Sequence, residues 1–417
     1  MLTNPIRPGR PVAPPFIKPY LDALNRMQEQ QYLLPEETTD RARALLTEKY
    51  GESESPVEVS FAYGPAGLMS DHTHYFDGFA LFMPLRFGTG VAVRYTSARF
   101  SRVVFEAGSG PWVFDASTEA PGKDVKSDAP FWARVAQEVV RRLSTRDRQF
   151  EIAVVSSVPS ACIEAYLSAL GVAVARSIQA LTESKVKTAA LLKHVQEGIA
   201  NSFEIPFSIG YVVAADAGRP NYFTLVDASN LEHLPLEAPT REVLGWGLAS
   251  TVSEVGRPLS FYPKMLDKAN EAVDHLTKHG YPHMTSLRDL DHSELQRALG
   301  ILPRPLRPIV RYLVTENRRV NKMVFAVRNK DWQMFGALLL MSHASRRNDF
   351  GASNEQADFI VEQVEVMSLE GMYGASLSGR GRSVLIAGQP FIIPQCLDTV
   401  QSSFEQRFEA RPDVMLL

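Results

Sequence analysis

A carboxylate, two imidazoles and a phenol lie within five positions in the stretch GPAGLMSDHTHYFDG, residues 64–78. The four groups belong to Asp71, His72, His74 and Tyr75. Carboxylates and imidazoles can exchange protons, and all four groups can hydrogen-bond the hydroxyls of a polar ligand. A His-x-His pair on a strand would also place both rings on one face, as in metal sites. No third ligand accompanies the pair in the sequence, so we predict no metal site.

A second candidate stretch, MYGASLSGRG at residues 372–381, combines glycines with a hydroxyl and a guanidinium. Glycines let a backbone approach a phosphate closely, and a guanidinium can hold an anion through two parallel hydrogen bonds. The stretch predicts a ligand-binding turn, and the alternative is a loop whose arginines, Arg380 and Arg382, face solvent. The predicted contacts are Ser378, Gly379, Arg380 and Gly381.

A serine-rich segment, SSVPSA at residues 156–161, precedes an apolar stretch with the composition of a buried helix. A helix N-terminus favours an anion because its first backbone N–H groups are unpaired. Ser160 could contact such an anion or cap the helix. The segment has no glycine and Pro159 lacks an N–H group, so its composition disfavours an ordinary phosphate loop.

Hydrophobic periodicity indicates strands mainly in the first half of the chain and helices mainly in the second. This order predicts the α+β class. The expected strands are 57–63, two segments within 78–95, 98–114, 150–156, 222–226 and 384–387. The expected helices are 21–50 with a start signal at Pro35, then 131–143, 162–175, 186–202, 264–279, 306–327, 332–345, 354–372 and 393–409.

Composition argues against a nucleic-acid-binding, disulfide-rich or membrane-spanning protein. The 417 residues carry a net charge of −3, which offers no basic surplus for nucleic-acid phosphates. Arginine pairs such as 318–319 and 346–347 are expected to be solvated. Two cysteines exclude a disulfide scaffold. No long apolar run indicates a membrane span or a signal peptide, so we expect a cytoplasmic protein without nucleic-acid or membrane partners.

Three stretches together resemble the galactokinase family. Residues 64–78 resemble its signature GRVNLIGEHTDYNGG, and 372–381 are similar to its third motif, GARMTGAGFGG. Between them, LVTEN-RRV and FGALLLMSHASRRNDFGAS resemble VxxEN-xRV and FGxLMxxSHxSLRDxYxVS. The resemblance spans about residues 40–417 and implies the GHMP kinase fold, with lobes at 1–200 and 201–417 around a cleft.

Several catalytic positions of the family carry other residues here. The resemblance places Pro65 at the position of an arginine that stabilises transferring charge, and Tyr211 at the position of the catalytic aspartate. Asp71 replaces a glutamate and His74 an aspartate, both of which hydrogen-bond sugar hydroxyls in the family. Phosphoryl transfer depends on such charged groups at fixed places, so these replacements argue against ordinary transfer.

Three functions remain open from the sequence. One is a pseudokinase that binds a sugar or sugar-phosphate-like ligand. Another is a repurposed enzyme in which acid/base chemistry uses His74, Tyr211 and Asp71, unless Tyr211 merely fills vacated space. The third is a sugar 1-kinase that uses ATP and magnesium, with Asp216 as base and Arg86 or Arg380 as the stabilising charge. The further residues predicted to bind ligand are His72, Tyr75, Asp77 and Tyr262.

Overall fold

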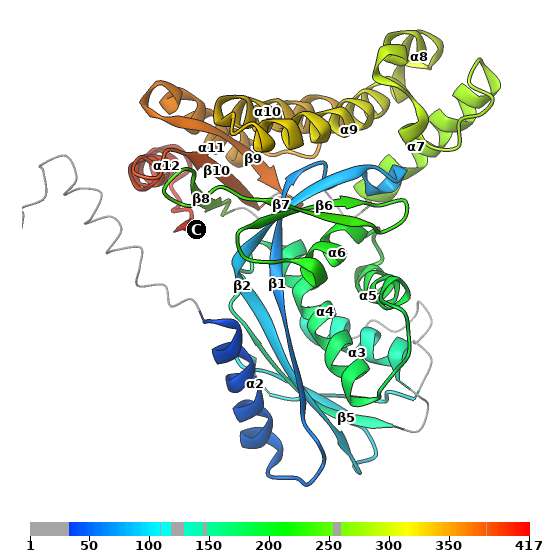
Figure 1. The fold of residues 1–417 in the computed structure, drawn as a ribbon, viewed down its shortest axis with the longest axis vertical. Coiled ribbons are helices and arrows are strands. Elements are labelled where there is room, and N and C mark those ends of the chain that lie inside the picture. The colour runs from blue at the N-terminus through cyan, green and yellow to red at the C-terminus, as the bar shows by residue number, and fades with distance from the viewer. Residues whose placement is uncertain (1–32, 109, 118–128, 145–147, 253–259, 381) are drawn as a thin grey trace, which may run out of the picture.

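A computed structural model describes residues 33–108, 110–117, 129–144, 148–252, 260–380 and 382–417. The chain contains two mixed layers of helices and strands, which Figure 1 shows with the larger sheet below the smaller one. None of the helices in these residues is long and apolar enough to cross a membrane. The mixture of sheets and helices confirms the α+β prediction.

The larger sheet has seven strands in the order β4-β3-β5-β2-β6-β7, and β1 pairs with β2 off this path. Helices α3 to α6 cover one face and α2 packs against the other (Figure 1). The strands are β1 (Glu58–Met69), β2 (Phe79–Thr96), β3 (Ser101–Phe105), β4 (Trp112–Phe114), β5 (Gln149–Ser156), β6 (Tyr222–Asp227) and β7 (His233–Glu237). The helices are α2 (Pro35–Tyr50), α3 (Phe131–Leu143), α4 (Ile163–Leu181), α5 (Thr188–Phe203) and α6 (Ile209–Ala217).

The smaller sheet has four strands in the order β11-β8-β10-β9 and is packed by the helices near the C-terminus. Its strands are β8 (Gly245–Ser250), β9 (Met372–Ser378), β10 (Ser383–Gly388) and β11 (Val414–Leu416). The helices of this half are α7 (Phe261–Lys278), α8 (Leu295–Ile301), α9 (Arg307–Arg328), α10 (Trp332–Ser345), α11 (Glu355–Val366) and α12 (Ile393–Phe408). Short helical turns follow these helices along the chain: η2 (Leu287–Asp289), η3 (His292–Glu294), η4 (Arg304–Leu306), η5 (Arg346–Phe350) and η6 (Met367–Glu370). A further turn, η1 (Thr73–Phe76), connects β1 to β2 of the larger sheet.

Glycines explain two places where the structure differs from the expected elements. Residues 78–95 form one long strand, β2, rather than two, because Gly88 and Gly90 allow close packing instead of a turn. A Cβ at Gly88 would lie 2.1 Å from the ring of Phe61. In the same way, the first part of 372–381 is strand β9, where the backbone of Gly374 lies against Gly336 of α10.

Most expected helices are present with ends shifted by a few residues. Helix α2 begins at the start signal of Pro35, and residues 21–32 of the expected helix 21–50 lie outside the described residues. The nine-residue helix α6 was not expected, because its sequence IGYVVAADA is almost entirely apolar and shows no helical period. Its placement matters for the site, since α6 carries Tyr211 into the region between the two sheets.

Candidate functional site

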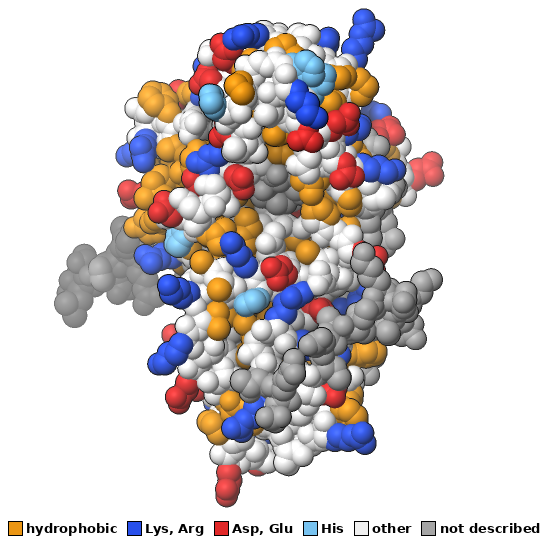
Figure 2. All heavy atoms as spheres, turned by 90° about the vertical axis from the view of Figure 1, so that its right-hand side faces the viewer, with side chains coloured by type: hydrophobic (Ala, Val, Ile, Leu, Met, Phe, Trp, Pro, Cys, Tyr) orange, Lys and Arg blue, Asp and Glu red, His pale blue; other side chains and the backbone are white. Residues whose placement is uncertain are grey.

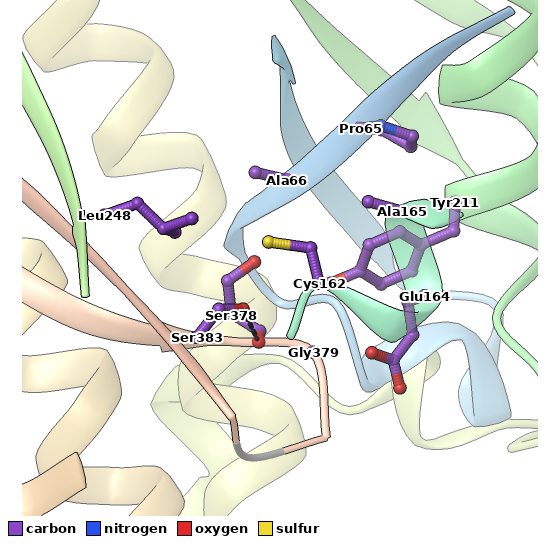
Figure 3. Close-up of a pocket in the computed structure, with 10 residues that line it drawn as sticks. All are labelled: Pro65, Ala66, Cys162, Glu164, Ala165, Tyr211, Leu248, Ser378, Gly379 and Ser383. Atoms are coloured by element: carbon purple, nitrogen blue, oxygen red, sulfur yellow. Dashed lines mark hydrogen bonds between the residues drawn. The ribbon is translucent and has the colours of Figure 1, made fainter. Parts of the chain in front are cut away.

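A small pocket lies where β1, the start of α4, α6 and the smaller sheet meet (Figure 3). Its free volume is about 10 Å³, which leaves room for about one water molecule. Its lining mixes apolar groups with hydroxyls and one carboxylate. The lining residues are Pro65, Ala66, Cys162, Glu164, Ala165, Tyr211, Leu248, Ser378, Gly379 and Ser383.

Asp71 lies beside this pocket, in the turn that follows β1, and is 1% exposed. Its carboxylate accepts a hydrogen bond from the Tyr211 hydroxyl at 2.9 Å and one from the Gly379 N–H at 2.8 Å. It also forms an ion pair with the buried guanidinium of Arg346. Arg346 in turn donates to the Gly379 carbonyl at 3.0 Å. We call Asp71, Arg346, Tyr211 and Gly379 the Asp71 cluster.

The charges and hydrogen-bonding groups of the Asp71 cluster are paired with one another. Burial alone would raise the pKa of Asp71, but Arg346, His72 and the two hydrogen bonds hold that pKa below its usual value. Burial, followed by the Asp71 charge, raises the pKa of Tyr211 well above its usual value. The Tyr211 hydroxyl therefore stays protonated and donates a hydrogen bond to Asp71. A buried, paired carboxylate and a protonated phenol are poor candidates for a general base at neutral pH.

His72 is enclosed between aromatic rings. Its ring stacks on Tyr262 at a centroid distance of 5.5 Å and lies 5.4 Å from the ring of Phe350. Its Nε2 atom is 3.3 Å from the Gly379 carbonyl oxygen. Burial lowers the pKa of His72 to about 4, against a partial opposing effect of Asp71. The imidazole is therefore neutral at physiological pH.

Acidification is expected to reduce stability through His72. Its pKa is about 4 in the folded chain and 6.5 as an ordinary histidine. Between these values the unfolded chain binds a proton that the fold excludes, so stability falls as the pH drops from about 6.5 to 4. The difference corresponds to about 3 kcal/mol. Urea unfolding at several pH values should show a shallower acid loss in His72→Gln than in the parent chain.

A matched variant for that comparison is His233→Gln, which changes an exposed histidine on β7. It should keep the parent pH profile. Subtracting the stability profile of the variant from that of the parent also removes the contribution of Glu164, whose raised pKa makes the fold more stable as the pH falls. An identical acid loss in His72→Gln and the parent would show that His72 is not the source.

The N-terminus of α4 is occupied by the chain's own carboxylate. Glu164 is in the first turn of the helix and is 4% exposed. One of its oxygens accepts from the Arg380 N–H at 3.2 Å, and the other lies 3.0 Å from Arg380 Nε. Burial raises the pKa of Glu164, and Arg380 opposes this rise. The N-terminus of α4, which favours an anion, therefore already holds the ion pair of Glu164 and Arg380.

Arg380 does not face solvent, so the alternative of a solvent-facing loop at residues 372–381 does not hold for this arginine. Its side chain is 12% exposed and lies over the ring of Tyr262 at 4.8 Å. It also donates to the backbone carbonyl of Pro206. Arg380 is therefore held by a carboxylate, a carbonyl and an aromatic face, and its charge is already matched within the chain.

The serine-rich turn before α4 packs into the protein interior and does not form an open phosphate-binding loop. Val158 is 6% exposed and belongs to the main apolar core, where it contacts the backbone position of Gly64. Ser156 bonds the Thr89 hydroxyl at 2.8 Å, and the Ser157 hydroxyl bonds the Gly88 backbone. Ser160 is exposed on the turn and does not line the pocket.

The structure brings together about half of the predicted site residues. Asp71, His72, Tyr211, Tyr262, Gly379 and Arg380 converge, and Ser378 lines the adjoining pocket. Asp77 is exposed, and its carbonyl accepts from Arg288 at 2.6 Å. The side chains of His74 and Tyr75 and the whole of Gly381 lie outside the described residues. Among the described residues no group of three or more His, Cys, Asp or Glu could hold a metal ion.

Arg346 was missed by the sequence reasoning, which assigned the pair 346–347 to a solvated face. That prediction was wrong for Arg346, which is 1% exposed and is among the largest fully buried side chains. The signal was present in the motif: SHASRRNDF places Arg346 where SLRD has a leucine. A cation at an apolar position required a buried anion nearby, and Asp71 supplies it.

Two of the three groups invoked for a rearranged kinase, Asp216 and Arg86, lie away from the pocket, and only Arg380 lies beside it. Asp216 is on α6, five residues after Tyr211, and forms a two-pronged ion pair with Arg176 at 2.7 Å for both bonds. Five residues along a helix rotate a side chain by about 140°. Asp216 therefore points away from Tyr211, and it does not line the pocket. Arg86 is exposed on β2.

Comparison with known proteins agrees with the motif resemblance. No protein-family model matches the chain. A galactokinase of Roseiflexus sp. is 29% identical over 334 residues, which cover 78% of this chain and 81% of that protein. Human galactokinase is 27% identical over 350 residues, with 82% and 85% covered.

Solved structures agree on the fold. The Lactococcus lactis galactokinase complexed with galactose superposes with a TM-score of 0.79 at 18% identity, covering 91% of this chain and 96% of that one. The Leishmania (L. major) mevalonate kinase complexed with R-mevalonate gives a TM-score of 0.56 at 13% identity. These relatives span nearly the whole described structure, including both sheets. The chain therefore has the fold of these kinases and is similar in sequence to galactokinases over about four fifths of its length.

Proposed function

We propose that this chain is a pseudokinase, a galactokinase homologue that binds a small sugar-like ligand without transferring a phosphoryl group. The observation that carries the proposal is the Asp71 cluster. Its carboxylate, guanidinium and phenol satisfy one another in the region that the motif resemblance assigns to substrate and catalytic base. Groups that are already paired and buried are not free to stabilise a transferring phosphoryl group.

Three further features of the pocket and its surroundings argue against phosphoryl transfer. Pro65 brings no charge to its position in the pocket lining. The helix end that would favour a phosphate holds Glu164 and Arg380 instead. Val158 fills the turn that would have to surround the phosphates. These three features support loss of transfer without depending on the Asp71 cluster.

A polar ligand remains part of the proposal because the pocket keeps polar groups. Tyr211, Ser378 and Ser383 present hydroxyls beside apolar Ala66 and Leu248 (Figure 3). Hydroxyls and the Glu164 carboxylate next to apolar surface suit a neutral sugar better than a phosphorylated one, and a sugar requires the pocket to widen beyond its present volume of about 10 Å³. The relative solved with galactose supports the same class of ligand for this chain.

The repurposed-enzyme reading has less support. It needs a titratable group poised near neutral pH, but Tyr211 has a strongly raised pKa and His72 a pKa of about 4. The sugar-kinase reading keeps one supporting observation, namely that the relatives at 26–29% identity carry the name galactokinase. It remains the second candidate.

The test is an assay for ADP release with ATP–magnesium and galactose or related sugars, run beside a thermal-shift titration. We expect no ADP release above background and no shift with ATP–magnesium. A raised melting temperature with a sugar is expected, because a ligand that binds only the fold stabilises it by mass action. Sugar-dependent ADP release that Asp216→Asn abolishes would replace this proposal with the kinase reading. The absence of any sugar shift would overturn the proposed ligand.

A further inference from the structure

Two histidines lie one helical turn apart at the C-terminal end of α7. The ring centroids of His275 and His279 are 4.2 Å apart, and the ring planes are inclined by only 20°. His275 is half-buried and His279 is exposed. Residues four apart lie on the same face of a helix, so the two imidazoles are neighbours, and rotation of the His275 ring out of the stack would turn its lone pair toward His279.

The tautomer of His279 is set by the backbone. Its Nδ1 atom is 2.7 Å from the carbonyl oxygen of His275. A carbonyl can only accept, so Nδ1 carries the proton and Nε2 carries the lone pair. Histidines that bind metals commonly donate their second ring N–H to a carbonyl or carboxylate in this way. The hydrogen bond therefore prepares Nε2 of His279 as a ligand atom.

The position at the helix end also favours a cation. His279 is the residue that ends α7, and His275 is in its last turn. The C-terminus of a helix carries partial negative charge from its unpaired carbonyls. Asp274 adds a carboxylate next to His275 in the sequence, while Lys278 opposes it with one positive charge. The local field is thus compatible with a divalent ion.

We propose that His275 and His279 form a surface site for a divalent transition-metal ion such as Cu²⁺, Ni²⁺ or Zn²⁺. Two histidines spaced four apart on a helix are a recurring pair of metal ligands. Imidazole prefers these ions over Mg²⁺ and Ca²⁺, and Cu²⁺ should bind most tightly. Among the residues described, no third protein ligand completes a cluster, so water fills the remaining positions.

The site is separate from the pocket and does not rest on the proposed function. Helix α7 belongs to the part of the chain that extends beside α8, at the upper right of Figure 1. In Figure 2 histidine atoms are exposed at this end of the molecule, with acidic and basic side chains around them. An ion bound there could be exchanged with solvent without opening the interior.

The test is calorimetric titration of the tag-free full chain with CuCl₂, NiCl₂ and ZnCl₂ near neutral pH. We expect binding in the order Cu²⁺ above Ni²⁺ and Zn²⁺, and weaker binding in acid because protons compete for Nε2. His275→Gln and His279→Gln should each lose more than about tenfold in affinity, since even loss of an outer-shell partner costs ~10–100-fold.

The chain has nine histidines, so the assignment depends on a control. His233→Gln alters an exposed histidine on β7 and should leave the affinity unchanged. If the double variant of His275 and His279 binds Cu²⁺ as tightly as the parent chain, the proposed site is wrong. The same conclusion follows if MgCl₂ binds as tightly as CuCl₂.

Discussion

Replacing Arg346 with leucine is expected to lower the free energy of unfolding by about 3–5 kcal/mol, although leucine is the family's residue at this position. The variant removes the positive partner of Asp71 and leaves that carboxylate buried at 1% exposure. It also removes the donor to the Gly379 carbonyl. An unpaired buried charge costs more than the pair itself contributes. Urea unfolding of the purified variant measures the loss.

Arg347→Leu is the matched control for this experiment. Arg347 is the next residue in the chain, but its side chain is 41% exposed and its ion pair with Glu362 is long, at 3.4 Å. Exposed pairs of this kind contribute about 0–1 kcal/mol, so this variant should remain close to the parent chain. Equal losses in the two variants would mean that the buried ion pair does not stabilise the interior.

A double variant separates loss of the pair from loss of packing. Asp71→Asn combined with Arg346→Leu removes both charges and keeps an oxygen that can accept from Tyr211 or Gly379. The double variant should be more stable than Arg346→Leu alone, since no unpaired charge remains buried. A double variant that is less stable than Arg346→Leu would contradict the charge argument.

Restoring the family's aspartate in Tyr211→Asp is expected to destabilise the fold by about 3 kcal/mol or more at pH 7. The new carboxylate would lie near Asp71 and Glu164, both of which already raise the pKa of Tyr211 by their charge. It would also leave Asp71 without its hydroxyl donor. We therefore expect the position that the motif resemblance assigns to a catalytic acid to be incompatible with an acid in this chain.

The pH dependence identifies the cause of that loss. A carboxyl group at position 211 would have a pKa raised above its unfolded value, so the fold would gain stability as the group is protonated in acid. The destabilisation relative to the parent should therefore be smaller at about pH 5 than at pH 7. Tyr211→Phe is the control, because it removes the hydroxyl without adding charge and should cost about 1.5–3 kcal/mol at either pH. A cost of Tyr211→Asp that does not change with pH would point to lost packing instead.

Local sequence was sufficient to predict the fold and most of the elements. The order and spacing of three motif stretches indicated the galactokinase fold, which the TM-score of 0.79 confirms. Helices with clear periodicity, such as α3, were predicted at their observed ends. These inferences succeeded because they depend on neighbours in the chain.

Only the tertiary structure showed which groups meet around Asp71. Arg346 and Asp71 are separated by 275 positions, and Gly379 and Asp71 by 308. No local pattern reveals that these groups meet, so a buried arginine resembled a solvated one in the sequence. The glycines of β2 and β9 looked like turn or phosphate signals because close packing and tight turns favour the same residue. The sequence alone showed where residues of the family's motifs are replaced in this chain, and long-range packing determined which charges meet around Asp71.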